Sequence, residues 1–163
     1  MVLPKVTMNA SPRPATPDDL EQVLKIESQS FPHPWTRSQF QAELERPYSR
    51  FYVLTDDETD EFVHGYIVYW LQAEGVSLLT VAIHPDDRGL GLGPKLLRTM
   101  VNEAVRDEIP KVMLEVRSSN LAAIKLYEKL GFKETHARPH FYQNGETAIV
   151  MELKTSELSG IIQ

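Results

Sequence analysis

The chain has 163 residues, 42% of them hydrophobic, and carries a formal net charge of −6 at pH 7. This length can bury one good core and argues against a second. The negative charge argues against general nucleic-acid binding, which needs clustered lysine and arginine, and it suits a positively charged substrate. Because the sequence has no cysteine, it can form neither a disulfide nor a thiol nucleophile.

The polar, proline-containing residues 1–12 are predicted to be a flexible lead, residues 13–154 one domain, and residues 155–163 a loose tail. We find no long apolar run, so we expect no signal peptide, no membrane partner and a cytoplasmic location. His136 and His140 are four residues apart, but Pro139 and the strand-like context argue against a helical metal pair. We therefore predict no metal site. The oligomeric state is not predicted.

Two capping patterns predict the first two helices. Thr16-Pro17-Asp18-Asp19 combines an N-cap with a proline at the first helical position. Thr36 and Gln39 form a capping box that opens the second helix. Residues 50–55 and 62–71 are predicted strands joined by the acidic turn 56–61, and the apolar, β-branched residues 76–83 are predicted to form a buried strand.

A glycine-rich loop, Arg88-Gly89-Leu90-Gly91-Leu92-Gly93, follows that last strand and precedes a strongly amphipathic helix. Glycines at every second position let the backbone approach a ligand, and the start of the helix offers free N–H groups and a positive dipole end. This arrangement predicts a site for an anionic diphosphate. Pro94 stands where a Walker loop and a dinucleotide fingerprint need other residues, so both are excluded. The alternative is a glycine-rich turn without a ligand.

The next strand, residues 111–117, places a carboxylate among apolar neighbours. Val112, Leu114 and Val116 share one face, so Glu115 lies on the other. We expect burial to raise the pKa of such a carboxyl, which would suit it to proton transfer near neutrality. The alternative is a structural ion pair with Arg117 or another cation.

Residues 121–130 are predicted to form a helix that buries or half-buries Tyr127, a position at which tyrosine is more often core than catalyst. Strands 132–142 and 147–153 would follow, joined by a tight turn at Asn144-Gly145. The predicted fold is α/β, in the order β-α-α-β-β-β-α-β-α-β-β. It would be a mixed sheet with helices on both faces.

Two motifs carry a family resemblance. Arg88-x-x-Gly91-x-Gly93 resembles the pyrophosphate-binding motif of the GNAT superfamily of N-acetyltransferases. The stretch from Leu114 to Phe132, which reads LEVRSSNLAAIKLYEKLGF, resembles protein N-terminal acetyltransferases, closest to the RimI type that modifies a ribosomal-protein N-terminus. The second motif is the more specific, and the resemblance runs from about Arg13 to Leu153.

The resemblance implies a GNAT fold, acetyl-CoA as the acetyl donor, and a role for each matching residue. Glu115 would be the general base and Tyr127 the general acid. The remaining residues would bind coenzyme A: Val81, Ala82 and Ile83 at the pantetheine, Arg88, Gly89, Leu90, Gly91, Leu92, Gly93 and Pro94 at the pyrophosphate, and Asn120 at the next helix.

The peptide would enter between the aromatic loop that holds Phe31, Pro32 and Trp35 and the hairpin that holds Phe141 and Tyr142. The chain departs from the family pattern at both places. The first loop is two residues longer than expected for RimI, and Phe141 replaces one of a pair of tyrosines. These departures affect peptide specificity more than acetyl transfer.

Near pH 7.4, removing a proton costs roughly 0.8 kcal/mol for an α-amine and roughly 4 kcal/mol for a lysine. A single carboxylate, acting directly or through water, readily supplies the smaller cost, so a peptide α-amine is the favoured acceptor. Two other functions stay open. One is acetylation of a small amine such as a polyamine or an amino sugar, and the other is a non-catalytic acyl-CoA-binding module. The presence of both Glu115 and Tyr127 argues against the last.

Overall fold

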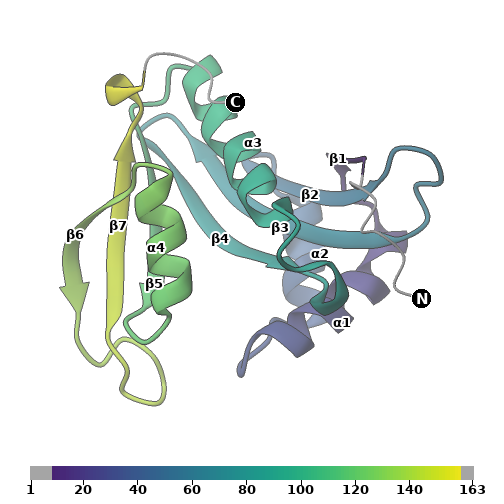
Figure 1. Ribbon diagram of the computed structural model, residues 1–163, viewed down its shortest axis with the longest axis horizontal. Coiled ribbons are helices and arrows are strands. Elements are labelled where there is room, and N and C mark those ends of the chain that lie inside the picture. The colour runs from purple at the N-terminus through teal and green to yellow at the C-terminus, as the bar shows by residue number, and fades with distance from the viewer. Residues whose placement is uncertain (1–8, 159–163) are drawn as a thin grey trace. The chain divides into compact units, whose positions relative to one another are not determined.

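The computed structural model describes residues 9–158, and their elements follow the predicted order (Figure 1). The strands are β1 (Ala10–Pro14), β2 (Ser49–Asp56), β3 (Val63–Gln72), β4 (Gly75–Ile83), β5 (Lys111–Arg117), β6 (Lys133–Arg138) and β7 (Ala148–Lys154). The helices are α1 (Leu20–Ser30), α2 (Arg37–Glu45), α3 (Leu92–Arg106) and α4 (Leu121–Lys129), with short 3-10 helices η1 (Pro17–Asp19), η2 (Pro85–Asp87) and η3 (Thr155–Glu157).

The strands form one mixed sheet of seven, in the order β1-β2-β3-β4-β5-β7-β6. Strands β4 and β5 are parallel, with Val76 opposite Val112. Strand β7 is antiparallel to both of its neighbours, β5 and β6. The predicted mixed sheet and element order are therefore confirmed.

The described residues divide into two compact units. The first comprises residues 9–68 and 80–97, and the second comprises residues 69–79 and 98–158. Strands β3 and β4 and helix α3 each contribute residues to both. None of the helices in the described part of the chain has the length and apolar character needed to cross a bilayer.

The first unit is built around Phe40 on α2, which is fully buried. Its ring centroid lies 5.0 Å from that of Trp35, 5.5 Å from that of Phe51 and 5.7 Å from that of Tyr66. The predicted capping box sets α2 in place, because the Thr36 side chain accepts a hydrogen bond from the Gln39 N–H at 3.3 Å. The capping box of Thr16 and Asp19 likewise opens η1, which continues into α1.

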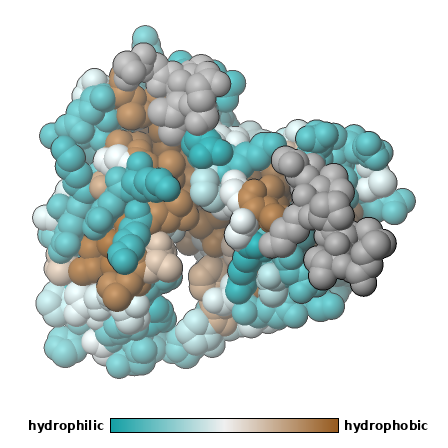
Figure 2. All heavy atoms as spheres, viewed as in Figure 1, coloured by the Kyte–Doolittle hydropathy of each residue, from teal (hydrophilic) through white to brown (hydrophobic). Residues whose placement is uncertain are grey.

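The second unit has its core between the rest of α3 and the strands β5 and β7. The apolar residues that it buries most completely are Tyr69, Val76, Met100, Val101, Ala104, Val112, Phe132, Ala148, Met151 and Leu153. Apolar side chains also reach the surface over α4 (Figure 2), where Leu121 at the helix start is 65% exposed.

Strand β6 is shorter than predicted. It ends at Arg138, whereas the sequence predicts a strand as far as Tyr142 joined to its partner by a tight turn. Pro139 follows, and because proline has no N–H to donate to the ladder, pairing stops there. Residues 139–147 form a loop instead, closed by a hydrogen bond from the Gly145 N–H to the Tyr142 carbonyl at 2.8 Å.

The chain ends also differ in part from the expectation. Strand β1 takes up the last three residues of the predicted lead, and η3 takes up the first three of the predicted tail. The Thr155 hydroxyl donates to the Ile109 carbonyl at 2.7 Å, which fixes the start of that segment. The rest of both segments, residues 1–8 and 159–163, lies outside the described residues.

Candidate functional site

A pocket of about 330 Å³ lies at the glycine-rich loop, in the first unit. It is lined by Ile83, Asp87, Arg88, Gly89, Gly91, Leu92, Gly93 and Pro94. The structure therefore brings the predicted diphosphate-binding residues together around one hollow, except Leu90, which is not among the lining residues. The lining residues come from the end of β4, from η2, from the loop that leads into α3 and from the first turn of α3.

The glycines of the loop do not all serve the same purpose. Gly89 has φ +80° and Gly91 has φ +79°, the left-handed region that side chains rarely adopt. A Cβ built on either would meet no protein atom within 4 Å, so the space beside both residues is open to a ligand. Gly93 has an ordinary helical backbone, and a Cβ there would lie 3.8 Å from Ile83 Cγ1.

Helix α3 presents its N-terminus at the same loop. The Lys95 N–H donates to the Gly91 carbonyl at 3.2 Å, which places Gly91 at the N-cap. The N–H groups of Leu92 and Gly93 therefore precede the first intrahelical bond and remain available for an anion. Pro94 has no N–H to satisfy. Open glycines and free helix donors fit the diphosphate of coenzyme A.

Arg88 holds the loop in place. Its Nε donates to the Ile83 carbonyl at 3.2 Å, and its Nη2 lies 3.1 Å from the Ser30 hydroxyl. The side chain thereby connects the loop to the end of β4 and to the end of α1. Because the residue remains exposed, its guanidinium can also meet an anion.

The end of β4 is shaped by a glycine on β3. A Cβ on Gly65 would lie 2.5 Å from Ile83 Cδ1 and 2.9 Å from the Ala82 carbonyl oxygen, so the Ile83 side chain occupies space that only glycine leaves free. Ala82 is buried, whereas Val81 and Ile83 are half-buried. Of these three predicted pantetheine contacts, Ile83 lines the pocket.

A buried carboxylate lies beneath the predicted substrate loop, and the sequence prediction omitted it. Glu27 on α1 accepts hydrogen bonds from the Tyr66 hydroxyl, from the Thr80 hydroxyl at 3.2 Å and from the Trp35 N–H at 3.3 Å. Burial raises the pKa of Glu27, and these hydrogen bonds partly offset it. The sequence could have predicted this burial from spacing, because Glu27 lies four residues after the buried Val23 and therefore on the same face of the helix.

Glu115 lies on β5 as predicted, but the expectation of a buried carboxylate is wrong. The residue is exposed, and its Oε1 accepts a hydrogen bond from Arg138 Nη1 at 3.1 Å. The face of β5 opposite to Val112, Leu114 and Val116 is therefore open at this point. The ion pair that the sequence left as an alternative exists, with Arg138 as its cation. Arg117 instead pairs with Glu146, at 3.2 Å.

Tyr127 is buried on α4, as predicted. Its ring lies 5.9 Å from that of Phe132 in an edge arrangement. Burial, with a smaller contribution from Tyr142, raises the pKa of Tyr127 to about 12. A hydroxyl with that pKa stays protonated at neutral pH, so it can donate a proton or a hydrogen bond.

Asn120 caps α4. Its side-chain oxygen accepts a hydrogen bond from the Ala123 N–H at 3.2 Å, and the residue is exposed. This contact satisfies one of the free donors at the helix start. The predicted contact with coenzyme A remains a prediction.

The predicted substrate residues fall into two groups, one in each unit. In the first unit, Phe31 and Trp35 are half-buried and Pro32 is exposed. In the second unit, Phe141 is 45% exposed, and the Arg117 guanidinium carbon lies 3.8 Å from the centroid of the half-buried Tyr142 ring. Both groups therefore keep aromatic surface that a peptide can reach.

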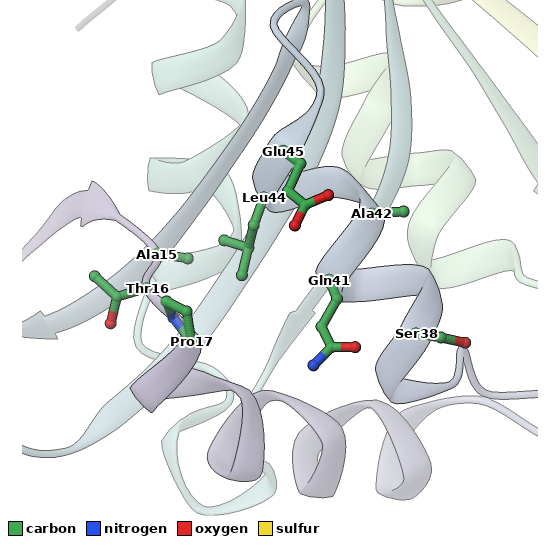
Figure 3. A pocket seen from close by; sticks show the side chains of 8 residues that line it. All are labelled: Ala15, Thr16, Pro17, Ser38, Gln41, Ala42, Leu44 and Glu45. Atoms are coloured by element: carbon green, nitrogen blue, oxygen red, sulfur yellow. The ribbon is translucent and has the colours of Figure 1, made fainter.

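A second pocket, of about 700 Å³, contains none of the predicted site residues (Figure 3). Side chains from α2 and from the segment around η1 surround it. Its lining residues are Ala15, Thr16, Pro17, Ser38, Gln41, Ala42, Leu44 and Glu45.

Among the described residues, no group of three histidine or acidic side chains could hold a metal ion.

Comparison with known proteins finds relatives that match nearly the whole chain. A protein from Salmonella typhimurium named as a [ribosomal protein bS18]-alanine N-acetyltransferase is 33% identical over 141 residues, which cover 85% of this chain and 93% of that protein. The crystal structure of the ribosomal-protein-S18-alanine N-acetyltransferase from Escherichia coli superposes with a TM-score of 0.81 at 28% identity, covering 94% of this chain and 99% of that one. The crystal structure of Ard1 from Thermoplasma volcanium superposes with a TM-score of 0.80, also at 28% identity, covering 90% and 97%.

The sequence model of the Acetyltransferase (GNAT) family matches residues 20–132. This range includes the pocket at the glycine-rich loop, Glu115 and Tyr127. The match confirms the family that the two sequence motifs indicate. The chain therefore belongs to the GNAT family of acetyltransferases.

Proposed function

We propose that this acetyltransferase transfers the acetyl group of acetyl-CoA to the α-amine of a protein or peptide N-terminus. The choice of acetyl-CoA as the acetyl donor rests on Gly89 and Gly91, whose left-handed backbone lies just before α3. These glycines leave space, and the start of α3 leaves N–H groups, for the diphosphate of the cofactor. The relatives named as alanine N-acetyltransferases support the α-amine as acceptor. We further propose that residues 13–154 act as one acetyltransferase domain.

Bound acetyl-CoA supplies an activated thioester, and the residues of this chain handle the protons. Glu115, directly or through a water, takes the proton from the ammonium group. The free amine then forms the new N–C bond as the C–S bond breaks, and the nitrogen gives up its second proton to water as the amide forms. Backbone N–H groups at the end of β4 would stabilise charge on the carbonyl oxygen, and Tyr127 would protonate the departing thiolate.

The peptide would contact the two aromatic groups, Phe31, Pro32 and Trp35 in one unit and Phe141 and Tyr142 in the other. The hydrogen bond from the Trp35 N–H to Glu27 supports this role for the first group, because it fixes the loop to the core. The Arg117 guanidinium over Tyr142 likewise restrains the second.

Three acceptors, assayed separately, test the proposal. The protein is incubated with acetyl-CoA and three acceptors in turn: a peptide beginning with alanine, the same peptide with its N-terminus blocked and an internal lysine free, and spermidine. Mass spectrometry locates the acetyl group. We expect rapid acetylation of the α-amine of the first peptide and little acetylation of the other two acceptors. Predominant lysine or spermidine acetylation would favour a small-amine or lysine acetyltransferase, and binding of acetyl-CoA without any transfer would indicate a non-catalytic module.

A further inference from the structure

A buried histidine at the start of β3 joins two carboxylates. His64 Nδ1 lies 2.8 Å from Asp87 Oδ2, and its Nε2 lies 3.0 Å from Asp56 Oδ1. Because an ionised carboxylate only accepts hydrogen bonds, the ring satisfies both carboxylates at once when both of its nitrogens donate, which is the cationic form of imidazole. His64 is 6% exposed, so a charge on its ring is shielded from solvent and acts mainly on these two carboxylates.

The contact between His64 and Asp87 matters for ligand binding because of where Asp87 lies. It is the last residue of η2, it directly precedes Arg88, and it lines the pocket at the glycine-rich loop. A carboxylate in the wall of a pocket for a diphosphate repels the ligand unless a cation compensates its charge. Among the described residues, His64 is the basic side chain that pairs with Asp87, and it supplies a compensating charge in its doubly protonated form.

The other groups around the pair do not replace this cation. The Phe62 ring lies 4.7 Å from the His64 ring and 5.3 Å from the His84 ring, so an aromatic side chain adjoins both histidines. His84 Nδ1 accepts a hydrogen bond from the Asp86 N–H at 3.1 Å. Arg88 is directed to the Ile83 carbonyl and to Ser30.

We propose that His64 is a positioning residue for the cofactor: it neutralises and holds Asp87, so that the glycine-rich loop accepts the diphosphate of coenzyme A. This inference rests on the proposed function. It assigns to His64 a role in binding the acetyl donor and none in the proton transfers. The kinetic consequence is therefore a change in the KM for acetyl-CoA rather than in kcat.

The experiment compares four variants of the full chain: His64→Gln, Asp87→Asn, the two combined, and Asp86→Asn as a matched control. The Asp86 side chain is 89% exposed, and its Oδ2 lies 3.9 Å from Nδ1 of His84. Calorimetric titration with coenzyme A gives the affinities, and initial rates with an alanine peptide give KM and kcat. Circular dichroism confirms that each variant is folded.

We expect the His64→Gln variant to bind coenzyme A about tenfold more weakly, which is the scale of one charge-assisted hydrogen bond. Its KM for acetyl-CoA should rise by a similar factor. Its kcat and its KM for the peptide should change little. Adding Asp87→Asn removes the uncompensated charge and should restore most of the affinity. Asp87→Asn alone leaves His64 charged and should bind coenzyme A more tightly than the unchanged protein. Asp86→Asn should match the unchanged protein.

The outcomes separate this inference from the proposed function. If the unchanged protein does not bind coenzyme A, both are wrong. If it binds and His64→Gln binds equally well, only the role of His64 is wrong. A double variant that is no better than His64→Gln, or an Asp87→Asn variant that binds more weakly, would mean that the contact is purely structural. The Asp87→Asn variant decides the question even if His64→Gln does not fold, because it leaves the histidine in place.

Discussion

Arg138 on β6 contacts Glu115 on β5 across the intervening strand β7, with 3.1 Å between Nη1 and Oε1. In the ladder, Glu115 is opposite Val150 and Arg138 is opposite Ala148, so the two side chains span the width of one strand. Both side chains are partly exposed, and such an ion pair contributes little to stability. The small contribution of this ion pair to stability therefore gives little reason for a carboxylate at position 115. The proposed role of Glu115 as the general base can be tested by comparing it with a purely structural role.

The first prediction uses two variants that break the same ion pair. Glu115→Gln removes the proposed base and should lower kcat with an alanine peptide near pH 7 by about 10²–10⁴-fold. Arg138→Met leaves the carboxylate in place and should lower it far less. Initial rates of peptide acetylation measure both. Equal losses in the two variants would show that the pair is structural, and the base would have to be another group or water.

The second prediction concerns the pH dependence of Tyr127→Phe. Because burial raises the pKa of Tyr127 to about 12, the hydroxyl keeps its proton throughout an assay from pH 7 to 9. Tyr127→Phe should therefore be slower than the unchanged protein by a constant factor over this range. Glu115→Gln should instead recover in part as the pH approaches the pKa of the α-amine, roughly 8.

Affinity for coenzyme A serves as the control for both variants, since neither side chain lines the pocket at the loop. A Tyr127→Phe protein with unchanged rates would leave this residue with a packing role against Phe132 alone.

The third prediction concerns Gly91. A Cβ there would meet no protein atom, so a Gly91→Val variant should lose coenzyme A binding because the side chain crowds the ligand and strains a backbone at φ +79°. Gly145→Val provides the matched control. Its φ is +82° and the nearest atom to a Cβ is His140 Nδ1 at 3.8 Å, so it carries the same strain in a different loop.

Calorimetric titration with coenzyme A distinguishes the two glycines. We expect binding to be lost in Gly91→Val and kept in Gly145→Val. Equal affinities in folded samples of both variants would contradict the assignment of the pocket to the diphosphate.

The fourth prediction concerns stability in acid. Burial acts to raise the pKa of Asp19, but hydrogen bonds from Arg13 and from the Thr16 N–H outweigh it and hold this pKa below its ordinary value. A carboxyl with a lowered pKa stabilises the fold above its unfolded value, about 4, and this stabilisation is lost as the pH falls through the lower folded value.

Asp19→Asn should accordingly lower the free energy of unfolding by about 1.5–3 kcal/mol at pH 7 and by less below pH 4. Asp18→Asn, an exposed neighbour in the same turn, is the control and should change little. Urea unfolding at several pH values measures both. A loss from Asp19→Asn that is the same at pH 3 and pH 7 would contradict the prediction.

The features that the sequence predicts well are local. The capping box of Thr36 and Gln39, the glycine loop and the start of α3 depend on residues a few positions apart, so their patterns can be recognised in the chain. The order of elements follows from such signals taken together. The same holds for Tyr127, whose burial follows from its position on an amphipathic helix.

The features that the sequence does not predict depend on distant partners. The exposure of Glu115 depends on what covers one face of the sheet, which the alternation along β5 does not encode. His64 and Asp87 are separated by 23 positions and meet only because β3 and β4 are neighbours in the sheet. Glu27 is surrounded by donors from three other segments, so its burial is favourable only in the folded protein.

Gly65 has a consequence for how this enzyme can change over generations. Even a methyl group at this position would displace Ile83, whose side chain lines the cofactor pocket, although Gly65 itself does not line that pocket. Replacement of Gly65 would therefore alter the grip on the acetyl donor while every residue of the recognisable loop stayed the same. A descendant of this sequence could keep the family motif intact and still lose its activity through one substitution on the neighbouring strand.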